Sequence, residues 1–199
     1  MLSLLGKRCV ELLYKHRLSH VSSCLNTVDL IDEIYSRRKS NEPVILDNGH
    51  ASLAHYVVLE KYFGHDAEKL LKKHGVHASR DMAHGIWVSN GSLGQAATVA
   101  LGMALADKTR NVWLVLSDGG CMEGCVYEVN RIASHHAANL KIAVIYNGYG
   151  AYQPIPVSDI PIRCCMSRVI GENFYPEFLR GLAGHYVILN NEQYEELMA

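Results

Sequence analysis

The stretch VWLVLSDGGCMEG at residues 112–124 decides the fold class, together with KIAVIYNGY at residues 141–149. Each begins with an unbroken apolar run, of the kind that forms a strand buried on both faces of a sheet. Residues 123–136, between the two runs, have a helical pattern. A strand, a helix and a strand in this order form a βαβ unit, whose strands are parallel. We therefore expect an α/β fold with a parallel sheet flanked by helices on both faces.

Polar and glycine residues follow both apolar runs at the point where each strand is expected to end. Asp118 and Gly119 follow the first run, and Asn147 and Tyr149 follow the second. Ligands of such sheets bind at the carboxyl ends of the strands. A carboxylate, an amide oxygen and the Tyr149 carbonyl are suitable ligands for a hard divalent cation, and glycine lets backbone N–H groups approach an anion. The pattern indicates a site for a cation and a diphosphate.

The rest of the chain also contains helix and strand patterns that are typical of an α/β protein. Apolar residues at helical spacing predict further helices, and short β-branched runs predict further strands. Thr27 is expected to be the N-cap of one helix, and residues 75–90 and 148–163 are expected to be loops. The helices are predicted at residues 2–17, 27–40, 51–63, 66–74, 92–107 and 192–198, and the strands at 44–46 and 186–189. At this length we expect one domain over residues 1–199.

Composition excludes several classes of function. The 19 Lys and Arg and 20 Asp and Glu give a formal charge of −1, which provides no electrostatic footprint for nucleic acid or anionic lipid. No apolar run approaches the roughly 18 residues that a membrane helix needs, and the first residues lack the apolar core of a signal peptide. We expect a cytoplasmic protein whose six cysteines are free thiols.

Four motifs occur in an order that resembles a known family. They are SHVSSCLNTVD at residues 19–29, NGHA at 48–51, NGSLGQ at 90–95 and DGGCMEG at 118–124. Their order, and the distances from His20 to Asp29 and from His77 to Gly91, are similar to those in the amino-terminal, diphosphate-binding domain of transketolase. The resemblance implies the thiamine diphosphate-binding fold, with a PP-type domain, and covers the chain from about His20 to its end.

The resemblance also implies roles for individual residues. Asp118, Asn147 and the Tyr149 carbonyl would bind Mg²⁺ or Ca²⁺, and Gly119 with its neighbouring backbone would bind the diphosphate of thiamine diphosphate. The thiazolium and aminopyrimidine side would contact residues Gly91, Ser92 and Leu93. Three residues match the family's active-site histidines, which contact the diphosphate or sugar hydroxyls and move protons: His20, His50 and His77. Glu123 and Glu128 match acidic residues at the subunit interface that link paired sites.

Each of these residues also has an ordinary structural interpretation. Histidine titrates near neutrality and can exchange a proton with a hydroxyl, but the chain has eleven histidines, and a surface or structural role is open for each. His50, which follows Asn-Gly at a strand-to-helix turn, is the strongest candidate. Glu123 and Glu128 are equally compatible with acidic residues near a helix N-terminus, which the macrodipole favours.

The sequence departs from the family pattern at three places. Ser117 stands where the family has glycine, which we expect to restrict the backbone there and weaken cofactor binding. The family's Gly-His-Pro-Gly and Gly-His-Pro appear as SHVS at residues 19–22 and VHA at 76–78. We expect the substrate preference to have drifted.

The family resemblance predicts a split enzyme. Thiamine diphosphate catalysis needs a carboxylate from a pyrimidine-binding domain, so we expect a separate partner chain that carries it, in a heterotetramer. The predicted reaction is transfer of a two-carbon ketol unit from a ketose, or ketose phosphate, to an aldose. A different thiamine diphosphate-dependent acyl- or aldehyde-transferring or decarboxylating subunit, and a non-catalytic scaffold subunit, are the alternatives.

Overall fold

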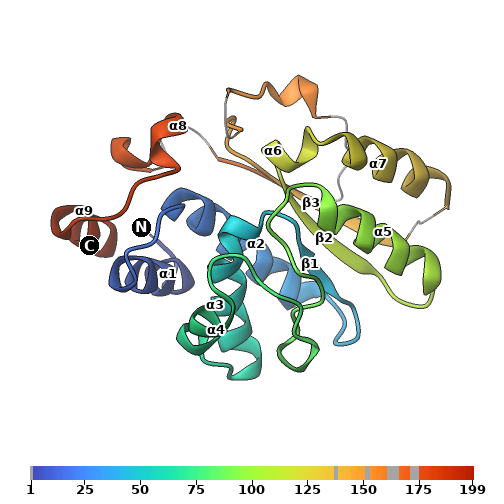
Figure 1. The fold of residues 1–199 in the computed structure, drawn as a ribbon, viewed down its shortest axis with the longest axis horizontal. Coiled ribbons are helices and arrows are strands. Elements are labelled where there is room, and N and C mark those ends of the chain that lie inside the picture. The colour runs from blue at the N-terminus through green and yellow to red at the C-terminus, as the bar shows by residue number, and fades with distance from the viewer. Residues whose placement is uncertain (1, 137–138, 151–152, 161–165, 171–174) are drawn as a thin grey trace.

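A parallel β-sheet forms the centre of the computed structural model, which describes residues 2–136, 139–150, 153–160, 166–170 and 175–199. Within these ranges the sheet has four strands in the order β1-β2-β3-β4, all parallel. They are β1 (Val44–Leu46), β2 (Val112–Ser117), β3 (Leu140–Tyr146) and β4 (Met166–Val169). The predicted α/β class and the parallel pairing of the two apolar runs are confirmed (Figure 1).

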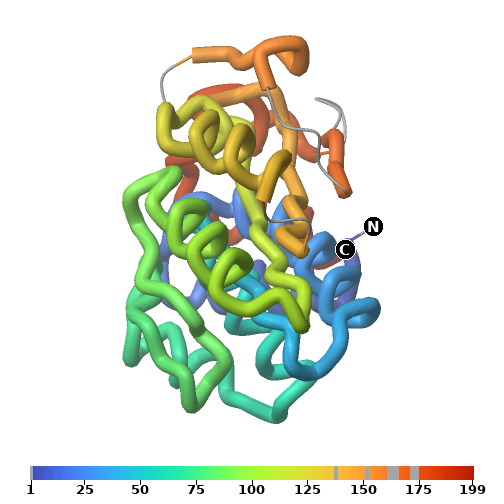
Figure 2. The backbone as a smooth tube through the Cα atoms, turned by 90° about the vertical axis from the view of Figure 1, so that its right-hand side faces the viewer, coloured from blue at the N-terminus to red at the C-terminus, as the bar shows by residue number. Residues whose placement is uncertain are grey.

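Helices lie on both faces of this sheet. The helices are α1 (Leu4–Lys15), α2 (Val21–Arg37), α3 (Ser52–Phe63), α4 (Ala67–His74), α5 (Gln95–Ala106), α6 (Asp118–Cys121), α7 (Gly124–His136), α8 (Gly181–Gly184) and α9 (Asn191–Met198). Figure 2 shows α5 and α7 side by side on one face. None of the helices in the described ranges combines the length and the apolar character that crossing a bilayer requires.

Alternation along the strands divides the buried residues into two cores. Val115 of β2 packs with the buried residues of α1 to α4, whereas its neighbours Leu114 and Leu116 pack with those of α5 and α7. Successive side chains of a strand point to opposite faces, so each fully apolar strand contributes to both cores. This explains why β2 and β3 read as continuous apolar runs rather than as alternating patterns.

Polar side chains fix the ends of several helices. Ser3 caps α1 by accepting a hydrogen bond from Gly6 N, and Asp66 caps α4 by accepting one from Lys69 N. Asn190 and Gln193 form a reciprocal capping box at the start of α9. Because such caps are local in sequence, the helices they bound lie close to their predicted positions.

The start of α2 was predicted wrongly. Thr27 is not an N-cap but lies inside the helix, fully buried, where its hydroxyl accepts a hydrogen bond from Asn48 Nδ2 at 3.1 Å. The helix begins at Val21, after His20, which has φ +65°. Ser23 and Asn26, in the first turns of the helix, are buried and line a cavity.

The last predicted strand is also wrong, and one strand was missed. Residues 186–189 pair with no strand in the described part of the chain. Leu189 is buried in the core beside α1, while Ile188 is 46% exposed. Buried and exposed side chains therefore alternate as in a strand, but the alternation arises from packing and not from hydrogen bonds to a neighbouring strand. The edge position next to β3 is taken by β4, whose sequence MSRV gives only a weak strand signal.

Candidate functional site

The carboxyl ends of β2 and β3 lie side by side and bring the predicted ligands together. Ser117 at the end of β2 is in register with Ile145 of β3. Asp118 Oδ2 accepts hydrogen bonds from the backbone N–H groups of Asn147 at 3.0 Å and Gly148 at 2.8 Å. Its Oδ1 accepts one from Gly119 N at 2.9 Å. The expected closeness of the two strand ends is therefore confirmed by direct contacts.

The Asp118 carboxyl group is nearly inaccessible to solvent, with 3% of the residue exposed. Burial raises its pKa from the ordinary value, and the backbone N–H groups of Asn147, Gly119, Gly148 and Tyr149 act in the opposite direction. These donors stabilise the ionised carboxylate, which is the form that a cation binds.

Ser117 does not restrict the backbone in the way its replacement of glycine suggested. It has φ −91° and ψ 166°, which is extended backbone that any residue adopts. Its Oγ accepts a hydrogen bond from Gly120 N at 3.1 Å and caps the short helix α6. The serine therefore supports the turn in a conformation that does not require glycine, and the expected weakening of cofactor binding stays a prediction.

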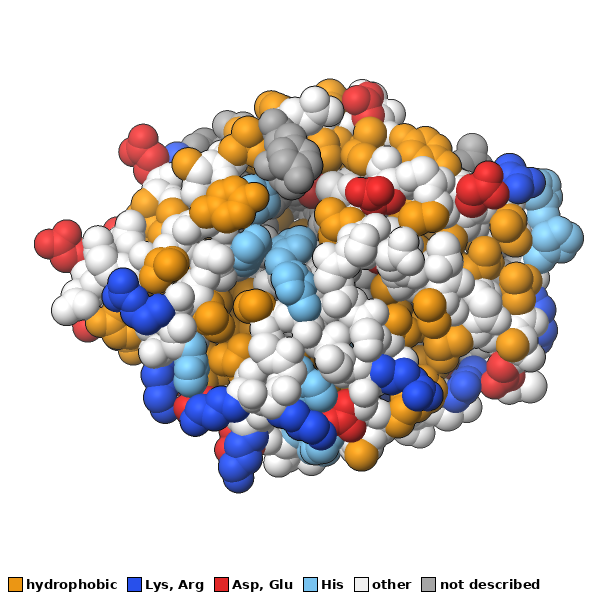
Figure 3. All heavy atoms as spheres, viewed as in Figure 1, with side chains coloured by type: hydrophobic (Ala, Val, Ile, Leu, Met, Phe, Trp, Pro, Cys, Tyr) orange, Lys and Arg blue, Asp and Glu red, His pale blue; other side chains and the backbone are white. Residues whose placement is uncertain are grey.

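A cavity opens beside this pair of strand ends, and its empty space, including the part open to solvent, is about 600 Å³. It collects residues from α2, from the turn after β1, and from the segments after β2 and β3. Its lining consists of His20, Ser23, Asn26, Thr27, Asn48, His50, Leu93, Ser117, Asp118, Gly119, Ile145, Asn147, Tyr149, Gly150, His185 and Tyr186. Histidine side chains gather around a hollow near the middle of the face shown in Figure 3.

Three histidines line the cavity close together. The rings of His20 and His50 have centroids 5.1 Å apart, and Tyr186 meets His20 edge-on at 5.6 Å. The backbone N–H of His20 donates to the carbonyl of His185 at 2.9 Å, which joins the start of α2 to the segment before α9. His20 holds a left-handed conformation (φ +65°), and such strain is often found at functional sites.

Burial favours the neutral form of these histidines. Burial lowers the pKa of His50 to about 3, with a further contribution from His20, His185 and His77. Burial also lowers the pKa of His20 and of His185, although Asp118 raises that of His185. A neutral imidazole has one N–H donor and one acceptor nitrogen, so the cluster can both donate to and accept from a polar ligand.

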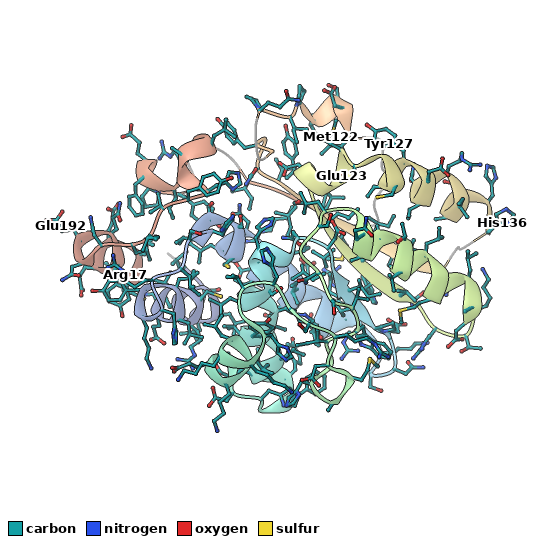
Figure 4. The ribbon with its side chains drawn as sticks, in the orientation of Figure 1. Arg17, Met122, Glu123, Tyr127, His136 and Glu192 are labelled. Atoms are coloured by element: carbon teal, nitrogen blue, oxygen red, sulfur yellow. The ribbon has the colours of Figure 1, made fainter. Side chains whose placement is uncertain are left out.

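The remaining predicted residues lie at the edge of the cavity or away from it. His77 is close to Gly91: a Cβ at Gly91 would be 3.7 Å from His77 Cγ. Glu123 lies with Met122 and Tyr127 where α6 meets α7 (Figure 4). Glu128 is exposed on α7 and pairs with Arg131 at 3.3 Å. Neither glutamate, nor Gly91, Ser92 or His77, lines the cavity.

Several cavity residues were not predicted from the sequence. Asn26 and Asn48 are 1% and 2% exposed, and in the described part of the chain the Oδ1 atom of each has no hydrogen-bond partner. His185 follows a glycine in a segment with no recognised motif, so no local signal distinguishes it from the other histidines. Only the folding of residues 184–186 against α2 places it in the site.

The residues present fit a dication and a diphosphate. A Cβ on Gly119 would lie 3.6 Å from Leu93 Cδ1 and 3.7 Å from Gly150 Cα, so it would fill the narrow space that the glycine leaves. Asn147 Oδ1 faces its own turn and accepts from Tyr149 N at 3.0 Å. In the described ranges no three His, Cys, Asp or Glu side chains form a metal-binding cluster.

Known proteins share features with this chain. Residues 66–153 match the family model described as "Thiamine pyrophosphate enzyme, C-terminal TPP binding domain". The chain is 24% identical over 159 residues to one of the subunits of the apulose-4-phosphate transketolase of Phocaeicola vulgatus, covering 70% of this chain and 56% of that protein. It is 27% identical over 151 residues to the 6-deoxy-6-sulfo-D-fructose transketolase subunit SqwG of a Clostridium species, covering 66% and 55%.

A third relative is longer. The chain is 30% identical over 137 residues to 1-deoxy-D-xylulose-5-phosphate synthase of Cutibacterium acnes, covering 65% of this chain and 22% of that protein. The chain thus spans about half of the length of the two transketolase subunits and about a fifth of the synthase. The parallel α/β fold, the bonded ends of β2 and β3 and these similarities together support a transketolase-type thiamine diphosphate-binding domain.

Proposed function

We propose that the chain is the diphosphate- and metal-binding subunit of a two-component, thiamine diphosphate-dependent transketolase-like enzyme. The proposed unit is one PP-type domain over residues 1–199, equivalent to the amino-terminal domain of transketolase. The proposed reaction moves a two-carbon ketol unit from a ketose, or ketose phosphate, to an aldose. The observation that carries the proposal is the buried Asp118 carboxylate, bonded to the Asn147–Gly148 backbone beside a histidine-lined cavity.

Asp118, the Asn147 side-chain oxygen and the Tyr149 carbonyl are the proposed ligands of Mg²⁺ or Ca²⁺. All three are hard oxygen donors, as these cations prefer. The diphosphate would lie against Gly119 and the backbone around it, where the absence of a Cβ allows an anion to approach. Leu93 lines the same cavity and is the proposed contact for the ring portion of the cofactor, together with Gly91 and Ser92.

Thiamine diphosphate, when bound, supplies the electron sink for breaking and forming the carbon–carbon bond. The protein's own part is to bind, orient and move protons. His20 and His50, held neutral by burial, can accept a hydrogen bond from a sugar hydroxyl and return a proton to it. His77 and the unpredicted His185 flank this pair. We assign His185 to the same polar side of the cavity as His20 and His50.

A partner chain that carries the pyrimidine-binding domain completes the proposed enzyme. Two relatives are themselves named as transketolase subunits, which supports a split arrangement. Glu123 and Glu128 lie on the exposed surface where α6 meets α7, and we place them at the subunit interface. The similarity to 1-deoxy-D-xylulose-5-phosphate synthase favours, as a second candidate, a component of another thiamine diphosphate-dependent enzyme.

Binding calorimetry tests the cofactor assignment. Wild-type protein, together with its partner chain, should bind thiamine diphosphate in the presence of Mg²⁺ and lose that binding with EDTA. Asp118→Asn keeps the shape of the side chain but removes its charge, and should reduce affinity at least about tenfold, as loss of a charged ligand implies.

Glu42→Gln is the matched control. Glu42 is another buried carboxylate, 3% exposed, but it lies at the opposite end of the strands, bonded to Asn111 and Trp113. This variant should bind the cofactor as the wild type does. Unchanged binding by Asp118→Asn would remove Asp118 from the site. Product analysis with ketose phosphate and 2-oxo acid donors separates the two candidate reactions.

A further inference from the structure

Asp47 is a fully buried carboxylate for which the proposed cofactor chemistry gives no role. It follows β1 directly, at the same end of the sheet as Asp118, and has no exposed surface. Its Oδ2 accepts a hydrogen bond from Gly94 N at 2.8 Å, and its Oδ1 accepts one from Ala96 N at 3.1 Å. The carboxylate therefore contacts the first turn of α5, 47 residues away in the sequence.

This contact replaces a local helix cap. The N-cap position of α5 is Gly94, which has no side chain to accept the free N–H groups of the first turn. An N-cap side chain normally provides that acceptor. Asp47 provides it from the residue that follows β1, and its negative charge is favourable at the positive end of the helix.

The same carboxylate also lies against α6. A Cβ on Gly120 would approach Asp47 Oδ2 to 2.9 Å, so the start of α6 is packed directly onto it. Leu93, next to Gly94, lines the cavity, where it lies across from Gly119. Asp47 thus holds together β1, the turn at residues 93–96 and the glycines of α6, which are the walls of the proposed cofactor site.

We propose that Asp47 is a positioning residue, which acts through the backbone of Gly94 and Ala96 to hold Leu93 and Gly119 in the geometry that binds the diphosphate cofactor. This inference rests on the proposed function for the identity of the ligand. The positioning itself is independent of the ligand, because it concerns hydrogen bonds within the protein.

Amide hydrogen exchange and cofactor binding test the two parts separately. In Asp47→Asn one carboxylate oxygen becomes an NH₂ group that faces a backbone N–H. We expect exchange at the amides of Gly94 and Ala96 to be at least about tenfold faster than in the wild type, as loss of a hydrogen bond to a charged group implies. The dissociation constant for thiamine diphosphate with Mg²⁺ should rise by a similar factor.

Glu42→Gln is again the control, because it removes a buried carboxylate at the other end of the sheet. It should change the melting temperature without changing cofactor affinity or exchange at residues 94 and 96. If Asp47→Asn does not fold, Asp47→Ser, which keeps one short acceptor, takes its place with the same expectations.

A pH profile gives a further readout. Burial, with a contribution from the neighbouring Glu123, raises the pKa of Asp47 to about 6, against the N–H groups of Gly94 and Ala96. Cys125 also faces this turn. Protonation below that pH removes an acceptor, so affinity should fall between about pH 7.5 and 5.5 more in the wild type than in Asp47→Asn. The diphosphate of the cofactor titrates in the same way with both proteins, so comparing the wild type with Asp47→Asn removes its contribution.

Unchanged cofactor affinity or unchanged exchange in the variant would overturn the positioning role. If the wild type binds no thiamine diphosphate, the proposed function fails, while the exchange rates at Gly94 and Ala96 still decide whether Asp47 holds the turn.

Discussion

Replacing Gly94 by alanine tests the packing of the turn that enters α5. Gly94 has φ +83°, and a Cβ there would lie 2.5 Å from Cys125 Sγ and 2.7 Å from Glu123 Cβ. The left-handed conformation costs an L-residue roughly 1–2 kcal/mol, and overpacking adds about 1–3 kcal/mol. We therefore expect Gly94→Ala to lower the free energy of unfolding by about 2–5 kcal/mol.

Gly64→Ala is the matched control for backbone conformation alone. Gly64 ends α3 with φ +69°, and nothing lies within 4 Å of the position where its Cβ would be. Its substitution should cost only about 1–2 kcal/mol. Urea unfolding followed by circular dichroism measures both values. In a chain of this size each kcal/mol also shifts the melting temperature by roughly 2–4 °C.

The two variants separate strain from overlap. A loss in Gly94→Ala that exceeds the loss in Gly64→Ala by about 1–3 kcal/mol supports the close contact of the turn with α7. Equal losses would refute it, because the difference between the two sites is the space around the added methyl group. The turn beside Leu93, which forms part of the cavity wall, would then be packed less tightly than the structure shows.

Three further outcomes follow from the geometry. The pKa of His50 is lowered to about 3, so its imidazole should not titrate in NMR spectra between about pH 5 and 8. Because the pKa of an unfolded histidine is near 6.5, the buried, neutral His50 should lower the free energy of unfolding progressively as the pH falls from about 6.5 towards 3. A titration midpoint of His50 near 6.5 in the folded protein would contradict its burial. Ser117→Ala should cost about 1 kcal/mol through loss of the α6 cap, and Ser117→Gly only a few tenths; wild-type stability of Ser117→Ala in urea unfolding would show that the cap contributes nothing. Thr27→Val leaves Asn48 Nδ2 without its acceptor and should cost about 1–3 kcal/mol; wild-type stability would exclude that bond.

The sequence predicted the centre of the fold well because its signals are local. The apolar runs of β2 and β3 and the helix between them allow one topology, since a βαβ crossover makes the strands parallel. That topology places Asp118 beside Asn147, and the bonds from the Asn147 and Gly148 backbone confirm it. The roles of these residues remain proposals.

The errors occur where polar residues are buried or apolar ones are exposed. Thr27 was expected to cap a helix, but it lies inside α2, which begins six residues earlier with polar residues that line the cavity. Residues 186–189 alternate like a strand but pack without a partner strand in the described part of the chain. A sequence pattern shows which residues are polar, and polar residues line the cavity as well as the outer surface.

The sequence alone determined the parallel α/β architecture and the approach of Asp118 to Asn147, because apolar periodicity and the handedness of a crossover act over short stretches of chain. Only the tertiary structure decided that His185 joins His20 and His50, and that Asp47 caps α5. Those contacts join segments that are far apart in the chain. The long-range packing that brings them together produces no local sequence pattern from which it could be predicted.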